Sequence, residues 1–136
     1  MNKCECIDII KKVKIGYLAT CDTNLQPYVR PIDMGTVYDS NIYFATFNNT
    51  NKIQQIANVN KVEVVFLYRY TQIRIIGIVE KIENIEMINR FMRDNRSISD
   101  LDNNSKEAKM ILYCIVPICV RYMGNDDNYY SKIDWE

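Results

Sequence analysis

Alternating apolar and polar residues predict β-strands along most of the chain. The predicted strands span residues 15–21, 27–38, 42–47, 61–69, 72–82 and 112–123, and most are rich in β-branched and aromatic residues. Short polar turns separate several of them, as at residues 22–24, 39–41 and 69–71. Strands joined by such turns favour a small antiparallel barrel over a parallel α/β sheet. The pattern therefore predicts a mainly β fold with flanking helices.

Apolar residues at helical spacing predict three short helices, over residues 5–13, 53–57 and 85–92. Asn84 directly precedes the third helix and is a suitable N-cap. The polar segment 93–104 is predicted as a loop, and 105–110 as a further helical turn. No linker or internal repeat interrupts these elements, so we expect one domain over residues 1–136.

Two residues predict local irregularities within the strands. Pro31 lacks an N–H for the sheet, so it indicates an edge strand, a β-bulge or a barrel bend, and the backbone around Arg30 and Pro31 could then contact something other than a strand. Gly77 indicates a bend or a close backbone approach within the strand 72–82.

A candidate anion site follows the strand 42–47. Asn48, Asn49, Thr50 and Asn51 form a polar turn that leads into the helix of Ile53 and Ile56. A helix that starts there directs unpaired N–H groups at one spot, where an anion is favoured. Thr50 can add a hydroxyl and Lys52 a positive charge. An ordinary helix cap is the commoner explanation of such a segment taken alone.

Composition narrows the possible functions. The chain has equal numbers of acidic and basic residues and no Lys/Arg cluster, so a nucleic-acid binder is not expected, although aromatic residues on strands suggest an oligonucleotide-binding barrel as a weak alternative. No apolar run reaches membrane-spanning length, and no signal-peptide pattern follows Met1. Five cysteines without framework spacing are typical of a reducing compartment. We therefore expect a cytoplasmic protein without a membrane or nucleic-acid partner.

Missing residue types exclude several kinds of catalysis. The chain has no histidine, which excludes Ser-His-Asp and Cys-His nucleophiles and His-bearing zinc sites. Its four glycines are too widely spaced for a P-loop or a dinucleotide-binding turn. Cys4 and Cys6 lack a second suitably spaced pair, so we expect no metal site. A protein that holds a cofactor fits this composition better than an enzyme acting through its own side chains.

Three further residues are interpreted from their position in the chain. Cys114 and Cys119 are five residues apart on one predicted strand and should face opposite sides. Trp135 is expected to anchor the core or a dimer, and a role in stacking on a flat ligand is the less common alternative.

Several segments, taken in order over residues 16–82, resemble the pyridoxamine 5'-phosphate oxidase family of FMN-binding split barrels. They are Val29-Arg30-Pro31-Ile32, Ile42-Tyr43-Phe44-Ala45-Thr46, Thr50-Asn51-Lys52-Ile53-Gln54-Gln55-Ile56, Asn60-Lys61-Val62 and Gln72-Ile73-Arg74-Ile75-Ile76-Gly77. The order and spacing carry the resemblance rather than any single segment. It implies an antiparallel six-stranded split barrel that binds FMN.

The resemblance also implies roles for individual residues. The strand of Val29, Arg30, Pro31 and Ile32 would lie along the isoalloxazine ring, with Arg30 reaching the phosphate. Ala45 and Thr46 match residues that contact the ring and ribityl chain, and Thr50, Asn51 and Lys52 match the phosphate-binding segment. Gln72 matches a residue that approaches the cofactor from the partner subunit. The implied assembly is a homodimer with FMN at its interface.

Two departures from the family pattern bear on the substrate. Asn51 occupies a position where pyridoxamine 5'-phosphate oxidases carry arginine, and their C-terminal Arg/His substrate motif cannot be complete without histidine. We therefore expect an FMN-dependent oxidoreductase acting on another small molecule, with no side chain assigned as a catalytic acid or base. The alternative is a protein that binds flavin or another planar cofactor for sensing or storage without turnover.

Overall fold

The computed structural model describes residues 1–136. Its helices are α1 (Lys3–Val13), α2 (Asn51–Asn58), α3 (Ile85–Asp94) and α4 (Arg96–Asn104). Its strands are β1 (Ile15–Cys21), β2 (Pro27–Asp33), β3 (Thr36–Tyr38), β4 (Asn41–Phe47), β5 (Lys61–Tyr68), β6 (Thr71–Lys81), β7 (Met110–Met123) and β8 (Ser131–Ile133). None of the helices is both long and apolar enough to cross a membrane.

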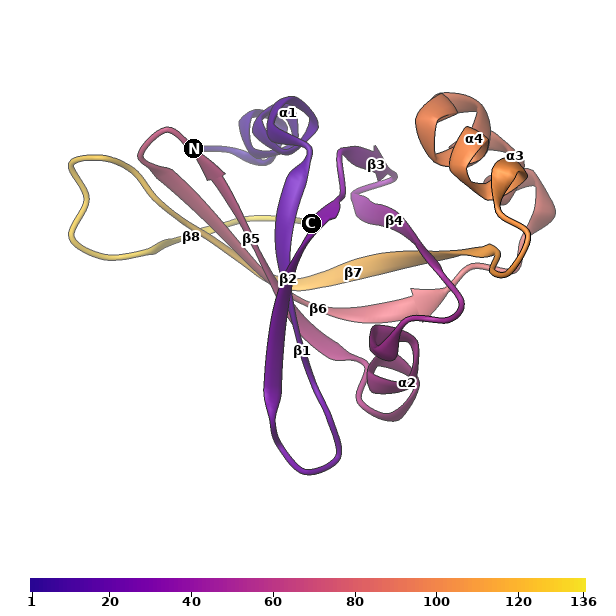
Figure 1. Cartoon of the computed structure of the whole chain (residues 1–136). Helices are drawn as coiled ribbons and strands as arrows, with labels where there is room; N and C mark the ends of the chain where they lie inside the picture. The colour runs from indigo at the N-terminus through magenta and orange to yellow at the C-terminus, as the bar shows by residue number, and fades with distance from the viewer.

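All eight strands form one antiparallel sheet that curls into a split barrel (Figure 1). The strand order is β2-β1-β5-β6-β7-β4-β3, and β8 also pairs with β7. The long strand β7 pairs with β4 over residues 110–115 and with β8 over residues 120–122. Six strands have seven or more residues, and β3 and β8 add three residues each. The predicted antiparallel split barrel is thereby confirmed. The short strand β3 is the end of the strand predicted over residues 27–38, and β8 is the strand that the pattern did not predict.

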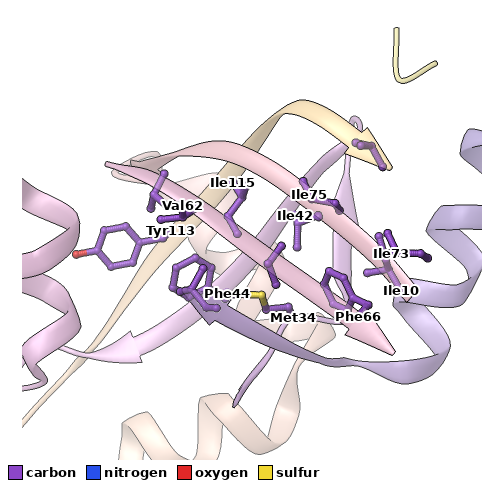
Figure 2. Packing of buried hydrophobic residues seen from close by; sticks show 14 of the residues in the cluster. Ile10, Met34, Ile42, Phe44, Val62, Phe66, Ile73, Ile75, Tyr113 and Ile115 are labelled. Atoms are coloured by element: carbon purple, nitrogen blue, oxygen red, sulfur yellow. The ribbon is translucent and has the colours of Figure 1, made fainter. Parts of the chain in front are cut away.

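The main core fills the barrel, and α1 and α2 lie at opposite ends of it (Figure 1). Ile10 of α1 belongs to the same buried cluster as Phe44 and Phe66 (Figure 2). Ile56 of α2 is part of this cluster too. Burying each such side chain contributes about 1.5–3 kcal/mol. Asn2 and Glu5 form a capping box at the start of α1, which fixes where that helix begins. The two helices thus close the barrel ends.

Pro31 lies in an edge strand, as one of its predicted alternatives required. Strand β2 is at the end of the sheet, and its pairing with β1 runs without a break from Ile15↔Asp33 to Cys21↔Pro27. Of the three alternatives at Pro31, the structure therefore shows the edge strand and no β-bulge. The segment 27–38 is instead divided at Met34 and Gly35, because the buried Met34 turns inward and its N–H donates to the Lys14 carbonyl at 2.6 Å.

The prediction of close backbone approach at Gly77 is confirmed. A Cβ at Gly77 would lie 2.5 Å from Cγ2 of Ile115 and 2.7 Å from the Val116 carbonyl oxygen. The β6–β7 register also shifts here, because Ile76 pairs with Cys119 and Gly77 with Pro117. Ile118 is the extra residue of this bulge.

The bulge overturns the prediction that Cys114 and Cys119 face opposite sides. Cys114 pairs with Glu80 and Cys119 with Ile76, and these partners are four residues apart on β6. Residues four apart on a strand share a face, so both cysteines lie on the same side of the sheet. The extra residue at Ile118 reverses the alternation that the prediction assumed.

The prediction of a loop over residues 93–104 is wrong, because all of them except Asn95 belong to α3 or α4. Helix α4 packs on α3 through Ile98, which joins Phe91 in a second buried cluster beside β4 and β7. Ile98 is the only buried residue of α4, so its sequence lacks the repeated apolar spacing that predicts a helix. The helical turn predicted over residues 105–110 is also wrong, because residues 105–109 form no helix and strand β7 begins at Met110.

The two chain ends lie together on the barrel. The Trp135 Nε1–H donates to the Ser40 carbonyl at 2.8 Å, and Trp135 packs against the main core. The Lys3 ammonium lies 5.4 Å from the centroid of its ring. The role of Trp135 as a core anchor is thereby confirmed.

Candidate cofactor site

The N-terminal end of α2 lies beside strands β1, β2 and β4, where polar side chains gather. Strand β4 enters the turn 48–50, and Thr50 is the N-cap residue of α2 with an extended backbone. Its hydroxyl donates to the Phe47 carbonyl at 3.1 Å and does not cap the helix. The site is therefore built from a strand, a turn and a helix start, as the sequence indicates.

Arg30 reaches from the edge strand β2 across β1 towards α2. Its Nη1 donates to the Thr20 Oγ1 at 2.6 Å and to the Leu18 carbonyl at 3.2 Å. Its Nη2 donates to the Gln55 Oε1 at 2.8 Å. All these acceptors are neutral, and burial lowers the pKa of Arg30. Its orientation is fixed while its positive charge stays unneutralised.

Lys52 brings a second positive charge to the same place. Burial lowers its pKa, and the nearby Arg30 charge lowers the pKa further. Neither Lys52 nor Arg30 forms an ion pair with an acidic side chain. Two partly buried cations that repel each other favour an anion between or beside them.

Backbone and hydroxyl groups complete the donor set. The N–H groups of Asn51 and Lys52 have no hydrogen-bond acceptor in the protein. The Thr50 Oγ1 lies 3.4 Å from the Lys52 Nζ and 3.5 Å from the Oγ1 of the buried Thr46. A phosphate monoester matches this combination of cations, free amides and hydroxyls at a helix start. The residues present therefore fit the phosphate end of FMN.

An open hollow of about 430 Å³ lies beside this donor set, between the β1–β2 turn and α2. Tyr28, Arg30, Asn51 and Gln55 are among the residues that line it, and most of its lining is polar. Arg30 and Asn51 line this hollow and also belong to the donor set, so polar parts of a bound ligand can extend into the hollow. No three Cys, Asp or Glu side chains of the protein converge in a way that could hold a metal ion.

The structure brings together five of the predicted site residues: Arg30, Thr46, Thr50, Asn51 and Lys52. The others lie around them. Val29 and Pro31 face outwards on β2, whereas Ile32 packs against the main core and Ala45 against the second cluster. Gln72 is not part of this group, because it accepts a hydrogen bond from the Tyr130 hydroxyl at the start of β6.

The sequence reasoning missed two residues that hold Arg30. Thr20 is buried, and its hydroxyl donates to the Gln55 Oε1 at 2.6 Å. The sequence does contain a signal for Thr20. It lies two residues after the apolar Leu18 on β1, so the alternation of the strand places this polar side chain inside the barrel. Gln55 lies three residues after Lys52, on the same side of α2.

Comparisons with known proteins bear on the family of the chain. The family model for pyridoxamine 5'-phosphate oxidase matches residues 3–110. A comparison with curated proteins found no match.

Solved structures share the fold at low sequence identity. A NimC/NimA family protein from Clostridium acetobutylicum matches with a TM-score of 0.78 and 17% identity, covering 94% of this chain and 91% of that chain. A pyridoxamine 5'-phosphate oxidase-related, FMN-binding protein from Nostoc punctiforme has a TM-score of 0.68 and 14% identity, with coverages of 96% and 88%. A heme-binding protein from Mycobacterium smegmatis has a TM-score of 0.72 and 11% identity, with coverages of 95% and 57%.

The family model and the fold thus lead to one assignment. The chain belongs to the pyridoxamine 5'-phosphate oxidase family.

Proposed function

We propose that this protein is an FMN-dependent oxidoreductase that acts on a small molecule. The observation that carries the proposal is the pair of partly buried cations, Arg30 and Lys52, which have no acidic partner and lie beside free N–H groups of α2. A phosphate group supplies the negative charge that this arrangement lacks. Membership of the family supports FMN as the molecule that carries it.

Each residue of the site would bind or orient the cofactor. Lys52, Thr50 and the α2 amides would hold the phosphate, and Arg30 would contact it from β2. Thr20 and Gln55 keep the Arg30 guanidinium in position. The outer edge of β2 has no strand partner, so the backbone around Val29–Ile32 is free to lie along a flat ring. When bound, FMN supplies the hydride or electron transfer.

The side chains offer no obvious acid or base for the reaction. The largest pKa changes raise Cys6 and Tyr38 to about 12 and Cys114 to about 11, in each case mainly through burial. These changes take the groups further from neutral pH, so they are unsuited to proton transfer there. The redox chemistry is therefore assigned to the cofactor alone.

The proposal includes a homodimer with FMN at its interface. The outer face of β1, β2 and β5 exposes Tyr17, Val29 and Leu67, and no helix covers it. A second copy packed there would bury this apolar surface and bring its own Gln72 towards the cofactor. Two FMN sites per dimer follow from this arrangement.

The second candidate is a protein that binds flavin or another planar cofactor without turnover. The heme-binding neighbour shows that proteins with this fold bind cofactors other than FMN. Heme ligation here would need Cys or Tyr, because the chain has no histidine.

Anaerobic reduction of the FMN-loaded protein separates the two candidates. We expect NADH or NADPH to bleach the flavin absorbance, and a quinone or nitroaromatic acceptor to restore it over repeated cycles. Free FMN at the same concentration is the control for reduction without the protein. Stable FMN binding without reduction by either donor would contradict the oxidoreductase and support the binding function.

A further inference from the structure

Three basic residues lie side by side on the outer face of the sheet. Arg74 on β6 pairs with Arg121 on β7, and Arg121 pairs with Lys132 on β8. Residues directly opposite each other on neighbouring strands point to the same side, and like charges in such positions repel. We call Arg74, Arg121 and Lys132 the basic row. Its arrangement costs stability unless negative charge lies nearby.

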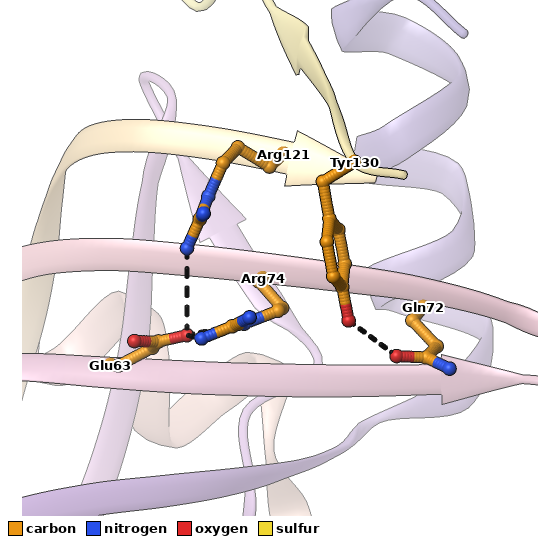
Figure 3. Close-up of polar contacts among 5 residues, drawn as sticks. All are labelled: Glu63, Gln72, Arg74, Arg121 and Tyr130. Carbon is orange, nitrogen blue, oxygen red and sulfur yellow. Dashed lines mark hydrogen bonds and ion pairs between the residues drawn. The ribbon is translucent and has the colours of Figure 1, made fainter. Parts of the chain in front are cut away.

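The protein supplies only part of that negative charge. The Glu63 Oε1 lies 2.5 Å from the Arg74 Nη2 and 3.9 Å from the Arg121 Nη2 (Figure 3). Lys132 forms no ion pair, and Asp134, which follows β8, forms none either. Lys61, on the same face of β5 as Glu63, adds another positive charge. One carboxylate is therefore shared by Arg74 and Arg121, whereas Lys132 and Lys61 have none. The Arg121 Nε is inaccessible to solvent and has no acceptor.

An aromatic side chain places the basic row beside Gln72. The Tyr130 ring centroid lies 5.0 Å from the Arg74 guanidinium and 5.6 Å from that of Arg121. Its hydroxyl donates to the Gln72 Oε1, and Figure 3 shows both side chains on the same face as the two arginines. In the proposed dimer Gln72 approaches the partner's flavin. The basic row would then lie next to the reacting end of that flavin.

We propose that the basic row is a second anion site, which takes the carboxylate or phosphate of the molecule that reacts at the flavin. Guanidinium groups bind such anions through paired hydrogen bonds, and Tyr130 presents a flat surface beside them. The assignment to a substrate rests on the proposed function. The anion site itself rests only on the charges, pairing and contacts of these residues.

Calorimetric titration of the FMN-loaded protein with benzoate and phenyl phosphate tests the site at constant ionic strength. Loading with FMN fills the Lys52 site first, so a phosphate probe reports on the basic row. We expect at least one probe to bind, and Arg121→Gln to weaken it roughly tenfold. Lys132→Gln should weaken binding of the probe by a smaller factor. Because Lys132 is exposed, this variant should fold, so it still tests the site if the Arg121 variant does not fold. Neutral benzamide should not bind.

Arg69→Gln is the matched control, because Arg69 is an exposed arginine on the β5–β6 turn outside the basic row. Equal weakening in this variant would show a general charge effect and overturn the proposal. Failure of both benzoate and phenyl phosphate to bind would overturn the proposal too. If the Arg121→Gln substitution then also converts a dimer into monomers, the basic row instead contacts a carboxylate of the partner subunit. If the protein takes up no FMN but still binds benzoate through Arg121, the proposed anion site is supported and the proposed FMN-dependent function is contradicted.

Discussion

Lys52 and Arg30 define the candidate site through a charge imbalance that the folded chain leaves unresolved. Hydrogen bonds from Arg30 to Thr20 and Gln55 orient its guanidinium without neutralising it, and the Lys52 ammonium donates only to the Thr50 hydroxyl. Removing charges from water without a counter-ion is costly, so their persistence at one place is better explained by a ligand than by stability. Substitutions of these two residues therefore test the binding of the ligand most directly.

Lys52→Ala is expected to weaken FMN binding roughly ten- to a hundredfold, the range of a lost hydrogen bond between charged groups. Fluorescence titration of the apoprotein measures the affinity. Lys106→Ala is the control, because Lys106 is an exposed lysine outside both proposed sites. Unchanged affinity in Lys52→Ala, or an equal loss in Lys106→Ala, would show that Lys52 does not hold the phosphate.

The affinity for FMN should also fall as the pH rises through the alkaline range. A bound phosphate favours the charged ammonium, so the pKa of Lys52 is higher in the complex than in the free protein. Affinity is then highest below the free-protein pKa and declines as the pH rises from that value to the pKa of the complex. Because burial and Arg30 lower the pKa of Lys52, the decline begins at a lower pH than for an ordinary lysine.

Lys52→Arg serves as the comparison for the pH series, since arginine keeps its charge throughout this range. Its affinity should stay constant where that of the wild type declines. Parallel declines in both proteins would assign the pH dependence to another group.

At the scale of elements, the β6–β7 contact depends on the missing side chain of Gly77. Gly77→Ala is expected to destabilise the fold by about 1–3 kcal/mol through overpacking against Ile115 and the Val116 backbone. Urea unfolding followed by circular dichroism measures this loss. Gly124→Ala is the control, because the nearest atom there belongs to the exposed Asp127 side chain, which can move. A neutral Gly77→Ala would contradict the close packing described here.

The elements that the sequence predicted well are those with repeated apolar spacing or clear caps. Asn84 accepts from the Met87 N–H at 2.9 Å and starts α3, as predicted. Helix α4 was missed because a single residue, Ile98, attaches it to the core. The bulge at Ile118 was missed because it depends on the register with β6, which is a property of two strands rather than one.

For the whole molecule, an uncovered sheet face lies on the side opposite the barrel core. Val29 projects from this face and is 69% exposed. Val29→Lys is expected to weaken dimer association about tenfold or more, because it would bury an unpaired charge in each half of the interface. Sedimentation velocity over a range of concentrations measures the change. FMN affinity should fall together with the loss of dimer.

Ile85→Lys is the control for this experiment, because Ile85 is also an exposed apolar residue, on α3 and 68% exposed. It should leave the dimer intact. A wild-type protein that remains monomeric at concentrations of tens of micromolar would contradict the homodimer.

The candidate site was predictable where its parts are close in sequence. Thr50, Asn51 and Lys52 belong to one turn and helix start, so their shared location followed from local pattern. Thr20 and Gln55 meet Arg30 only after β1 has paired with β2 and α2 has packed on the barrel. The link between Tyr130 and Gln72 spans 58 residues, and no local pattern in the C-terminal segment indicates it.

The most direct test of the central claim is the visible absorption spectrum of the freshly purified protein, with the mass of any released chromophore. We predict the two-band spectrum of oxidised flavin and the mass of FMN, either as purified or after FMN is added. Binding of that chromophore should depend on Lys52. A colourless protein that takes up no added FMN would contradict the cofactor assignment, although the split-barrel fold would stand.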